Sequence, residues 1–150
     1  QTCALPIFQL VCDTNNIKII DDYAHHPSEI NSTLSAIKNV KKRKVIIFQP
    51  HRYTRLKALW DDFLNCFSSI DKLFVLDTFC AGDEFDEKYN SQNFVKEILK
   101  KGVDATYIKG DMEKSASQIA PKLCSKDIVL TLGAGDITKI GRFIDDLLSK

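Results

Sequence analysis

Three short, continuous apolar runs most strongly limit what this chain can fold into. They occupy residues 45–48, 73–76 and 128–132, and they consist of apolar side chains with one threonine. Because such runs have no polar face, they are typical of strands that are covered on both sides. This arrangement occurs in parallel sheets lying between two layers of helices.

Helical patterns separate these runs. Ile30, Leu34 and Ile37 recur at helical spacing, which predicts a helix of three to four turns starting at Pro27. Further helices are expected from about residue 55, around 94–99, over 112–123 and from 136, with short strands at 8–12, 17–20 and 105–108. Turn formers between the first two strands indicate a hairpin. The sequence therefore predicts an α/β, Rossmann-like three-layer domain: a mostly parallel sheet flanked by helices, with an N-terminal β-hairpin.

Size and charge narrow the classes of protein. The chain has 150 residues, enough for one domain, and its formal net charge of +1 argues against nucleic-acid binding. The basic residues 41–44 are expected to form a solvated loop. No apolar stretch approaches the ~20 residues that span a bilayer, and we expect no secretory signal. The five cysteines are scattered, without a C-x-x-C pair, which fits reduced thiols in a cytoplasmic protein.

Residues 1–7 are treated separately. They lack a start methionine and any clear period, and they resemble the translated read-through of a sequencing adapter. We expect this segment to be non-native and the domain to cover residues 8–150. An ordinary N-terminus of no special meaning is the alternative.

A polar cluster follows the apolar residues 17–20. Residues 21–27 read Asp-Asp-Tyr-Ala-His-His-Pro, so two carboxylates, a phenol and two imidazoles lie close together in the sequence. An acid at this position often caps the next helix, but capping does not require so many polar groups. A carboxylate at a strand end also suits ribose hydroxyls. We expect a ligand role, with capping as the simpler alternative.

A second polar cluster follows the strand at residues 45–48. It contains His51, Arg52 and Arg55. The fork of an arginine side chain matches carboxylates and phosphates, and the two arginines share a face if a helix starts at Arg52. Pairing with surface acids is the alternative, but the combination favours a negatively charged ligand.

All three histidines of the chain fall in these two clusters. A metal site with Asp22 is conceivable, but the neighbouring arginines would repel a divalent cation, so we expect none. A third cluster, Gly-Ala-Gly-Asp at residues 133–136, ends the last apolar run. It resembles a phosphate-binding turn without the full G-x-G-x-x-G pattern. A tight turn with Asp136 capping the last helix is equally consistent with it.

The three clusters together resemble a known family. Asp22-Tyr23-Ala24-His25-His26-Pro27, the stretch Phe-Gln-Pro-His-Arg-Tyr-Thr-Arg at 48–55, and Leu-Gly-Ala-Gly-Asp-Ile at 132–137 are similar to the C-terminal domain of the Mur ligases. The similarity covers about residues 8–150. Within the family, the sequence resembles members that use ATP to join L-alanine to UDP-N-acetylmuramate in peptidoglycan synthesis. Residues 77–82 also resemble the family, whereas Gln92 stands where many relatives carry an arginine.

The resemblance implies a role for each matching residue. Asp22 and Tyr23 would contact ATP, and L-alanine would be bound by a second set of side chains: His25, His51, Arg52 and Arg55. His26 is expected to be structural. No catalytic residue is expected in this chain, because the resemblance places the phosphate loop and the Mg²⁺ ligands in a central domain that this sequence lacks. The chain alone should be inactive. A stand-alone nucleotide- or carboxylate-binding module is the alternative reading.

Overall fold

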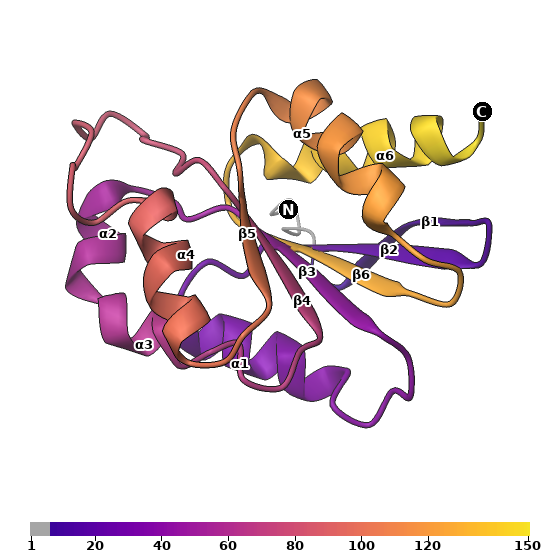
Figure 1. Ribbon diagram of the computed structural model, residues 1–150, viewed down its shortest axis with the longest axis horizontal. Helices are drawn as coiled ribbons and strands as arrows, with labels where there is room; N and C mark the ends of the chain where they lie inside the picture. The colour runs from indigo at the N-terminus through magenta and orange to yellow at the C-terminus, as the bar shows by residue number, and fades with distance from the viewer. Residues whose placement is uncertain (1–6) are drawn as a thin grey trace, which may run out of the picture.

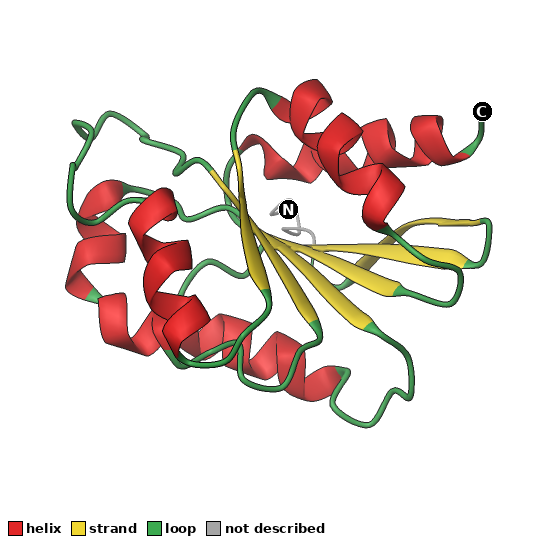
Figure 2. Cartoon of the chain, in the orientation of Figure 1, coloured by secondary structure: helices red, strands yellow, loops and turns green. Residues whose placement is uncertain are grey.

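The computed structural model describes residues 7–150, in which a six-stranded sheet has the order β1-β2-β6-β3-β4-β5. Residues 1–6, most of the segment expected to be non-native, lie outside the described part. The strands are β1 (Gln9–Thr14), β2 (Ile17–Asp22), β3 (Lys44–Phe48), β4 (Lys72–Leu76), β5 (Ala105–Ile108) and β6 (Ile128–Leu132). Only β1 runs antiparallel, against β2. The predicted mixed sheet with its N-terminal hairpin is confirmed (Figure 2).

Helices cover both faces of the sheet (Figure 1). They are α1 (Pro27–Ala36), α2 (Tyr53–Ala58), α3 (Trp60–Leu64), α4 (Ser91–Lys100), α5 (Met112–Ile119) and α6 (Ile140–Leu148), with 3₁₀ turns η1 (Ala120–Lys122) and η2 (Asp136–Lys139). The first four helices pack on one face, and α5 and α6 pack on the other. This gives the three layers predicted from the apolar runs.

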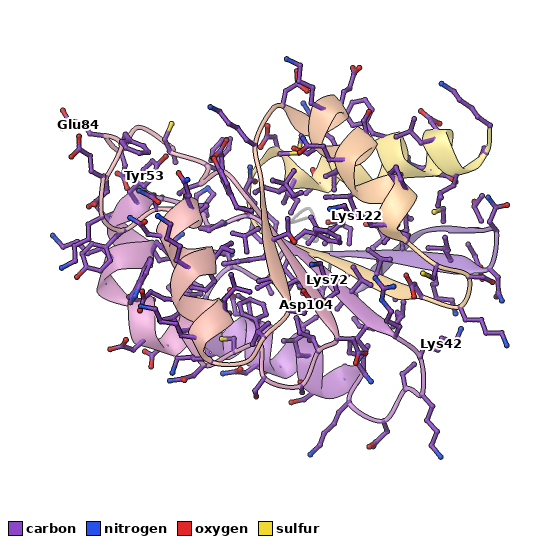
Figure 3. The ribbon with its side chains drawn as sticks, viewed as in Figure 1. Lys42, Tyr53, Lys72, Glu84, Asp104 and Lys122 are labelled. Carbon is purple, nitrogen blue, oxygen red and sulfur yellow. The ribbon has the colours of Figure 1, made fainter. Side chains whose placement is uncertain are left out.

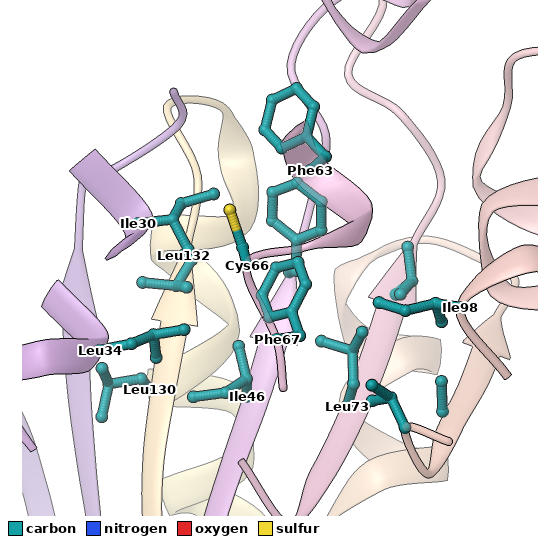
Figure 4. Close-up of a cluster of buried hydrophobic side chains, with 14 of the residues drawn as sticks. Ile30, Leu34, Ile46, Phe63, Cys66, Phe67, Leu73, Ile98, Leu130 and Leu132 are labelled. Carbon is teal, nitrogen blue, oxygen red and sulfur yellow. The ribbon is translucent and has the colours of Figure 1, made fainter. Parts of the chain in front are cut away.

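Alternate residues of each central strand supply the two cores. Ile46 and Phe48 of β3 point into the core beneath α1–α4, whereas Val45 and Ile47 point toward α5 and α6; all four are fully buried. Figure 4 shows part of the first core, where α1 side chains lie beside those of β6. Burial on both faces explains why these strands lack a polar face.

The hairpin between β1 and β2 is tighter than predicted. Its turn consists only of Asn15 and Asn16, with φ of 54° and 62°. Both values lie in the left-handed region that a two-residue type I′ turn requires, and Asn tolerates it better than most residues. The strands therefore extend into residues that the sequence pattern assigned to the turn.

The helix predicted from about residue 55 is divided. Leu59 has φ −118° and ψ 26°, outside helical values, and separates α2 from α3. Beyond the break the Trp60 ring packs edge-on against Tyr89 and Phe94. Similarly, the helix predicted to end near Pro121 closes with the 3₁₀ turn η1.

Candidate functional site

The carboxyl ends of three adjacent parallel strands bring the polar clusters together. Asp22 of β2 and Phe48 of β3 both pair with Leu132 of β6, so the chain leaves all three strands at one edge. Beyond that edge the rings of His25 and His51 have centroids 5.9 Å apart. The first two clusters thus form one polar surface, and residues 133–136 lie between the strands that carry them.

His25 is held in one tautomer by the backbone. Its Nδ1 lies 3.0 Å from the carbonyl oxygen of Tyr23. Because that oxygen can only accept, Nδ1 carries the proton and Nε2 of the neutral ring keeps a lone pair. The segment is fixed further by Glu29, whose carboxylate accepts from the backbone N–H groups of His25 and His26. This is the reverse half of a capping box, with His26 at the N-cap of α1.

His51 is held in the opposite tautomer. Nη1 of Arg55 lies 3.0 Å from Nδ1 of His51 and also donates to the His51 carbonyl oxygen, at 3.1 Å. A guanidinium can only donate, so Nδ1 accepts and Nε2 carries the proton. Burial, followed by the nearby Arg55 charge, lowers the pKa of His51 and favours the neutral ring. The two imidazoles therefore offer a lone pair from His25 and an N–H from His51.

Arg52 does not share a helical face with Arg55, because α2 starts one residue later, at Tyr53. Arg52 is the N-cap residue, with φ of 75°. Its Nη2 lies 3.5 Å from a carboxylate oxygen of Asp83, and its side chain is 45% exposed. One arginine therefore orients His51, while the other faces solvent beside an acid.

Asp22 is buried, and its carboxylate is already engaged. One oxygen accepts from the N–H of Ala24 at 2.8 Å, and the other accepts from the N–H of Phe8 at 3.0 Å. Asp22 and Tyr23 lie at a hollow of about 260 Å³ that Thr33 of α1 also lines. Asp22 holds the β2–α1 turn in shape, and this hollow is the space next to it in which a ligand could sit.

Asp21, the other acid of the first cluster, points away from this hollow. Its carboxylate accepts a hydrogen bond from the Thr131 hydroxyl, at 2.6 Å, and ties β2 to β6. Burial raises the pKa of Asp21 above its ordinary value. This acid therefore belongs to the sheet rather than to the ligand surface.

The turn at residues 133–136 is filled by protein. The Gln49 amide donates to the Asp136 carboxylate at 2.9 Å and accepts from the N–H of Ile137 at 3.3 Å. A Cβ added at Gly135 would lie 2.7 Å from Cγ of Phe79 and 2.8 Å from the Gln49 amide oxygen. Gln49 thus engages the N–H of Ile137, and Gly135 allows the close packing of Phe79 and Gln49.

The sequence did not single out a second hollow, of about 430 Å³, at the ends of β4 and β5. Tyr53, which is labelled in Figure 3, is one of the residues that line it. The Tyr107 hydroxyl donates to Asp77 there, and burial followed by that carboxylate raises the pKa of Tyr107. Gln92, the residue that departs from the family pattern, also lines this space. Its sequence signals were an acid directly after a buried strand and the resemblance of residues 77–82 to the family.

Within residues 7–150, no group of three or more His, Cys, Asp or Glu side chains is arranged to hold a metal ion. No helix in the same range is long and apolar enough to cross a membrane.

Comparison with known proteins decides the family. Residues 8–135 match the family model described as "Mur ligase, glutamate ligase domain". This chain belongs to the Mur ligase family. The domain is 37% identical over 147 residues to the UDP-N-acetylmuramate–L-alanine ligase of Rickettsia felis, covering 95% of this chain and 31% of that protein. The Mur ligase domain thus spans about a third of the length of such curated relatives.

Solved structures of Mur ligases share the fold. The crystal structure of a UDP-N-acetylmuramate–alanine ligase from Thermotoga maritima superposes with a TM-score of 0.72 at 26% identity, over 95% of this chain and 30% of that one. A crystallised ligase domain from Haemophilus ducreyi gives 0.69 at 19% identity, and the match covers 98% of its length. The domain therefore corresponds to the C-terminal unit of these ligases.

Proposed function

We propose that this Mur ligase domain binds L-alanine and contacts ATP in a ligase that joins L-alanine to UDP-N-acetylmuramate. The observation that carries the proposal is the pair of imidazoles at the carboxyl edge, whose ring centroids are 5.9 Å apart and whose Nδ1 atoms have opposite hydrogen-bonding roles beside Arg52 and Arg55. The similarity to alanine-adding ligases, at 37% identity, supports the same assignment.

The side chains suit the two ends of an amino acid. The Arg52 side chain is 45% exposed, and Nε2–H of His51 is a second donor, so both can bind the carboxylate. Nε2 of His25 has the lone pair that an amine can donate to. Arg55 acts through His51, whose ring it holds. These assignments together place the amine at the His25 side of the site.

Asp22 and Tyr23 are proposed to contact ATP from the hollow beside α1. Among residues 7–150, each oxygen of the Asp22 carboxylate accepts one hydrogen bond, so each can accept a second from a ribose hydroxyl. Residues 7–150 offer no acid cluster for Mg²⁺. We assign the Mg²⁺ ligands and the phosphate loop to other domains of the ligase, which would also bind UDP-N-acetylmuramate. The enzyme would act in the cytoplasm.

The proposed reaction divides the labour between domains. The carboxylate of UDP-N-acetylmuramate takes the γ-phosphoryl group of ATP and becomes an acyl phosphate. The alanine amine then attacks the acyl carbon, and phosphate leaves from the tetrahedral intermediate. This domain would orient the nucleophile, and orientation supplies a large part of such rate enhancements. Closure of the domains would complete the site, so the domain alone should be inactive.

A chimeric enzyme tests the proposal. Residues 8–150 would replace the matching C-terminal part of the Rickettsia felis ligase, and phosphate release would be followed with L-alanine, glycine, L-serine and D-glutamate. We expect turnover with L-alanine as the preferred amino acid, and none from the 150-residue chain alone. A folded chimera that binds ATP but prefers another amino acid, or uses none, would contradict the proposal. Tight ATP binding by the isolated chain in calorimetry would favour a stand-alone binding module.

A further inference from the structure

The loop at residues 79–83 makes an unusual set of contacts with the segment that carries His51 and Arg52. The β3–β4 pairing stops within the sheet, but a parallel bridge joins His51 to Phe79 beyond it. The N–H of Phe79 donates to the Pro50 carbonyl oxygen at 2.8 Å, and the N–H of Arg52 donates to the Phe79 carbonyl oxygen at 2.7 Å. The two segments are therefore fixed to each other outside the sheet.

The Phe79 ring holds the His51 ring from one side. The two rings are stacked, with centroids 5.3 Å apart and planes 11° apart. Phe79 is itself backed by Gly135, where a Cβ would approach to 2.7 Å. The imidazole orientation is thus set by a stack of Gly135, Phe79 and His51, together with the hydrogen bond from Arg55.

Asp83 holds the other half of the segment. One oxygen of its carboxylate accepts from the Thr54 N–H at 3.1 Å and the Thr54 hydroxyl at 2.8 Å. The other lies 3.5 Å from Nη2 of Arg52. The Thr54 hydrogen bonds, with the charge of Arg52, lower the pKa of Asp83 and keep it ionised.

The backbone at Arg52 requires such support. Its φ of 75° is in the left-handed region, where a residue with a side chain is strained. The loop that reaches Arg52 is similarly shaped: Ala81 and Gly82 have φ of 48° and 91° and return the chain so that Asp83 faces α2. Strained backbone persists where its surroundings fix it, and such positions concentrate at functional sites.

We propose that Phe79 and Asp83 are positioning residues for the amino-acid site: Phe79 orients the His51 ring, and Asp83 orients the Arg52 guanidinium. The proposal rests on the proposed function only in naming the ligand as an amino acid. The contacts of Phe79 with His51 and of Asp83 with Arg52, called the clamp below, lie within this chain. Neither residue needs to touch the ligand, since each acts through a side chain that does.

The experiment combines kinetics of the chimeric ligase with NMR of the 150-residue chain. The variants are Phe79→Leu, Phe79→Tyr, Asp83→Ala and Asp83→Asn. Asn can still accept from Thr54 but has no charge for Arg52. Glu84→Gln, which removes a charge from an exposed position directly after this loop (Figure 3), is the matched control. Circular dichroism melts confirm that each variant is folded.

We expect Phe79→Leu and Asp83→Ala to raise KM for L-alanine by about 10-fold or more with kcat changed by less than about 3-fold, since displaced binding groups weaken ground-state binding. Asp83→Asn should show a smaller rise. Phe79→Tyr and Glu84→Gln should stay within about 2-fold of the unchanged enzyme. In the isolated chain, ¹⁵N shifts of His51 should report a mixed tautomer in Phe79→Leu, and the Arg52 Nε–H signal should move in Asp83→Ala.

Two outcomes overturn the clamp. One is an unchanged alanine KM in Phe79→Leu and Asp83→Ala while Arg52→Ala raises it, which leaves the proposed function standing. The other is unchanged His51 and Arg52 signals in the folded variants. If Arg52→Ala leaves the alanine KM unchanged but these signals move, the clamp is supported and the amino-acid site is wrong.

Discussion

The two ends of the same sheet differ in the size of their hollows and in how their side chains are held. At the amino end, a hollow of about 1210 Å³ is lined mainly by the basic loop at residues 38–44, with Asp71, Lys72 and Asp104. At the carboxyl end the hollows are smaller, about 260 and 430 Å³. By volume alone, the hollow at the amino end would be chosen as the ligand site.

Orientation of the side chains reverses that choice. At the amino end Lys72 is paired with Asp104 at 2.9 Å, and Lys41 and Lys42 are exposed. At the carboxyl end, buried or half-buried groups fix one another, and His25 and His51 keep ring nitrogens free for a partner. Exposed lysines contribute little to binding energy, because their charge is screened by water and their side chains lose rotamer freedom when a ligand orders them. The carboxyl edge, where side chains hold one another in place, therefore fits the proposed ligand site better than the larger hollow at the amino end does.

The largest expected difference between the two ends is in packing. Gly135→Ala should lower the free energy of unfolding by about 2–3 kcal/mol, because its Cβ would overlap Phe79 and Gln49. Gly102→Ala, near the amino end, should cost about 1–2 kcal/mol, because its φ of 86° is strained but its surroundings are open. Urea denaturation measures both. Equal losses would show that the carboxyl edge is not tightly packed.

A second difference concerns pH, at Asp21. Its pKa is raised in the folded state by burial, so its stabilising contribution is present below the unfolded pKa of about 3.9 and is lost as pH rises through the folded value. The unfolding free energy of the unchanged chain, relative to that of Asp21→Asn, should therefore fall between pH 4 and pH 7. Denaturation at several pH values measures this.

Asp83, at the same edge, should change the free energy of unfolding with pH in the opposite direction. Its pKa is lowered, chiefly by the Thr54 hydrogen bonds, so its contribution is present above about pH 3.9 and is lost as pH falls through the folded value. Parallel pH trends for Asp21→Asn and Asp83→Asn would contradict the environments described.

A smaller effect, a change in the pKa of His51, is expected when Arg55 is replaced. Replacing Arg55 by Met removes a positive charge and a donor to Nδ1, so the pKa of His51 should rise toward its ordinary value of about 6.5. NMR titration of the ring measures it. Arg142→Met, at an exposed position of α6, is the control and should leave it unchanged. A His51 pKa that is insensitive to Arg55 would remove the basis for its fixed tautomer.

The smallest effect is predicted at the amino end. The double change Lys41→Gln and Lys42→Gln should alter stability by less than about 0.5 kcal/mol, as for most exposed substitutions. It should also leave the KM values for ATP and L-alanine unchanged in the chimera. A several-fold change in either KM would show that the basic loop takes part in binding.

Much of this fold could be predicted from the sequence because the central strands are buried on both faces. The apolar run at 128–132 coincides with β6, and the polar residues that follow the runs lie at one edge, as parallel strands require. The break at Leu59 could not be predicted, since it has no Pro or Gly and arises where Trp60 packs on Tyr89 and Phe94.

The sequence could predict that polar residues meet at one edge of the sheet, but not the contacts between them. His25, His51 and Arg55 converge as expected, whereas Arg52 turns toward Asp83, 31 positions along the chain. The closure of the Gly-Ala-Gly-Asp turn depends on Gln49. Such long-range contacts between side chains carry no periodicity, so no local pattern reveals them.

The most direct test of the account is the KM for L-alanine of the chimeric ligase carrying Arg52→Ala. Loss of a charge-assisted hydrogen bond, worth roughly 1.5–3 kcal/mol, should raise that KM by about 10- to 100-fold. The KM for ATP should change by less than about 3-fold, and Arg142→Ala should change neither. An alanine KM that is unchanged in the folded Arg52→Ala enzyme would contradict the amino-acid site at the carboxyl edge.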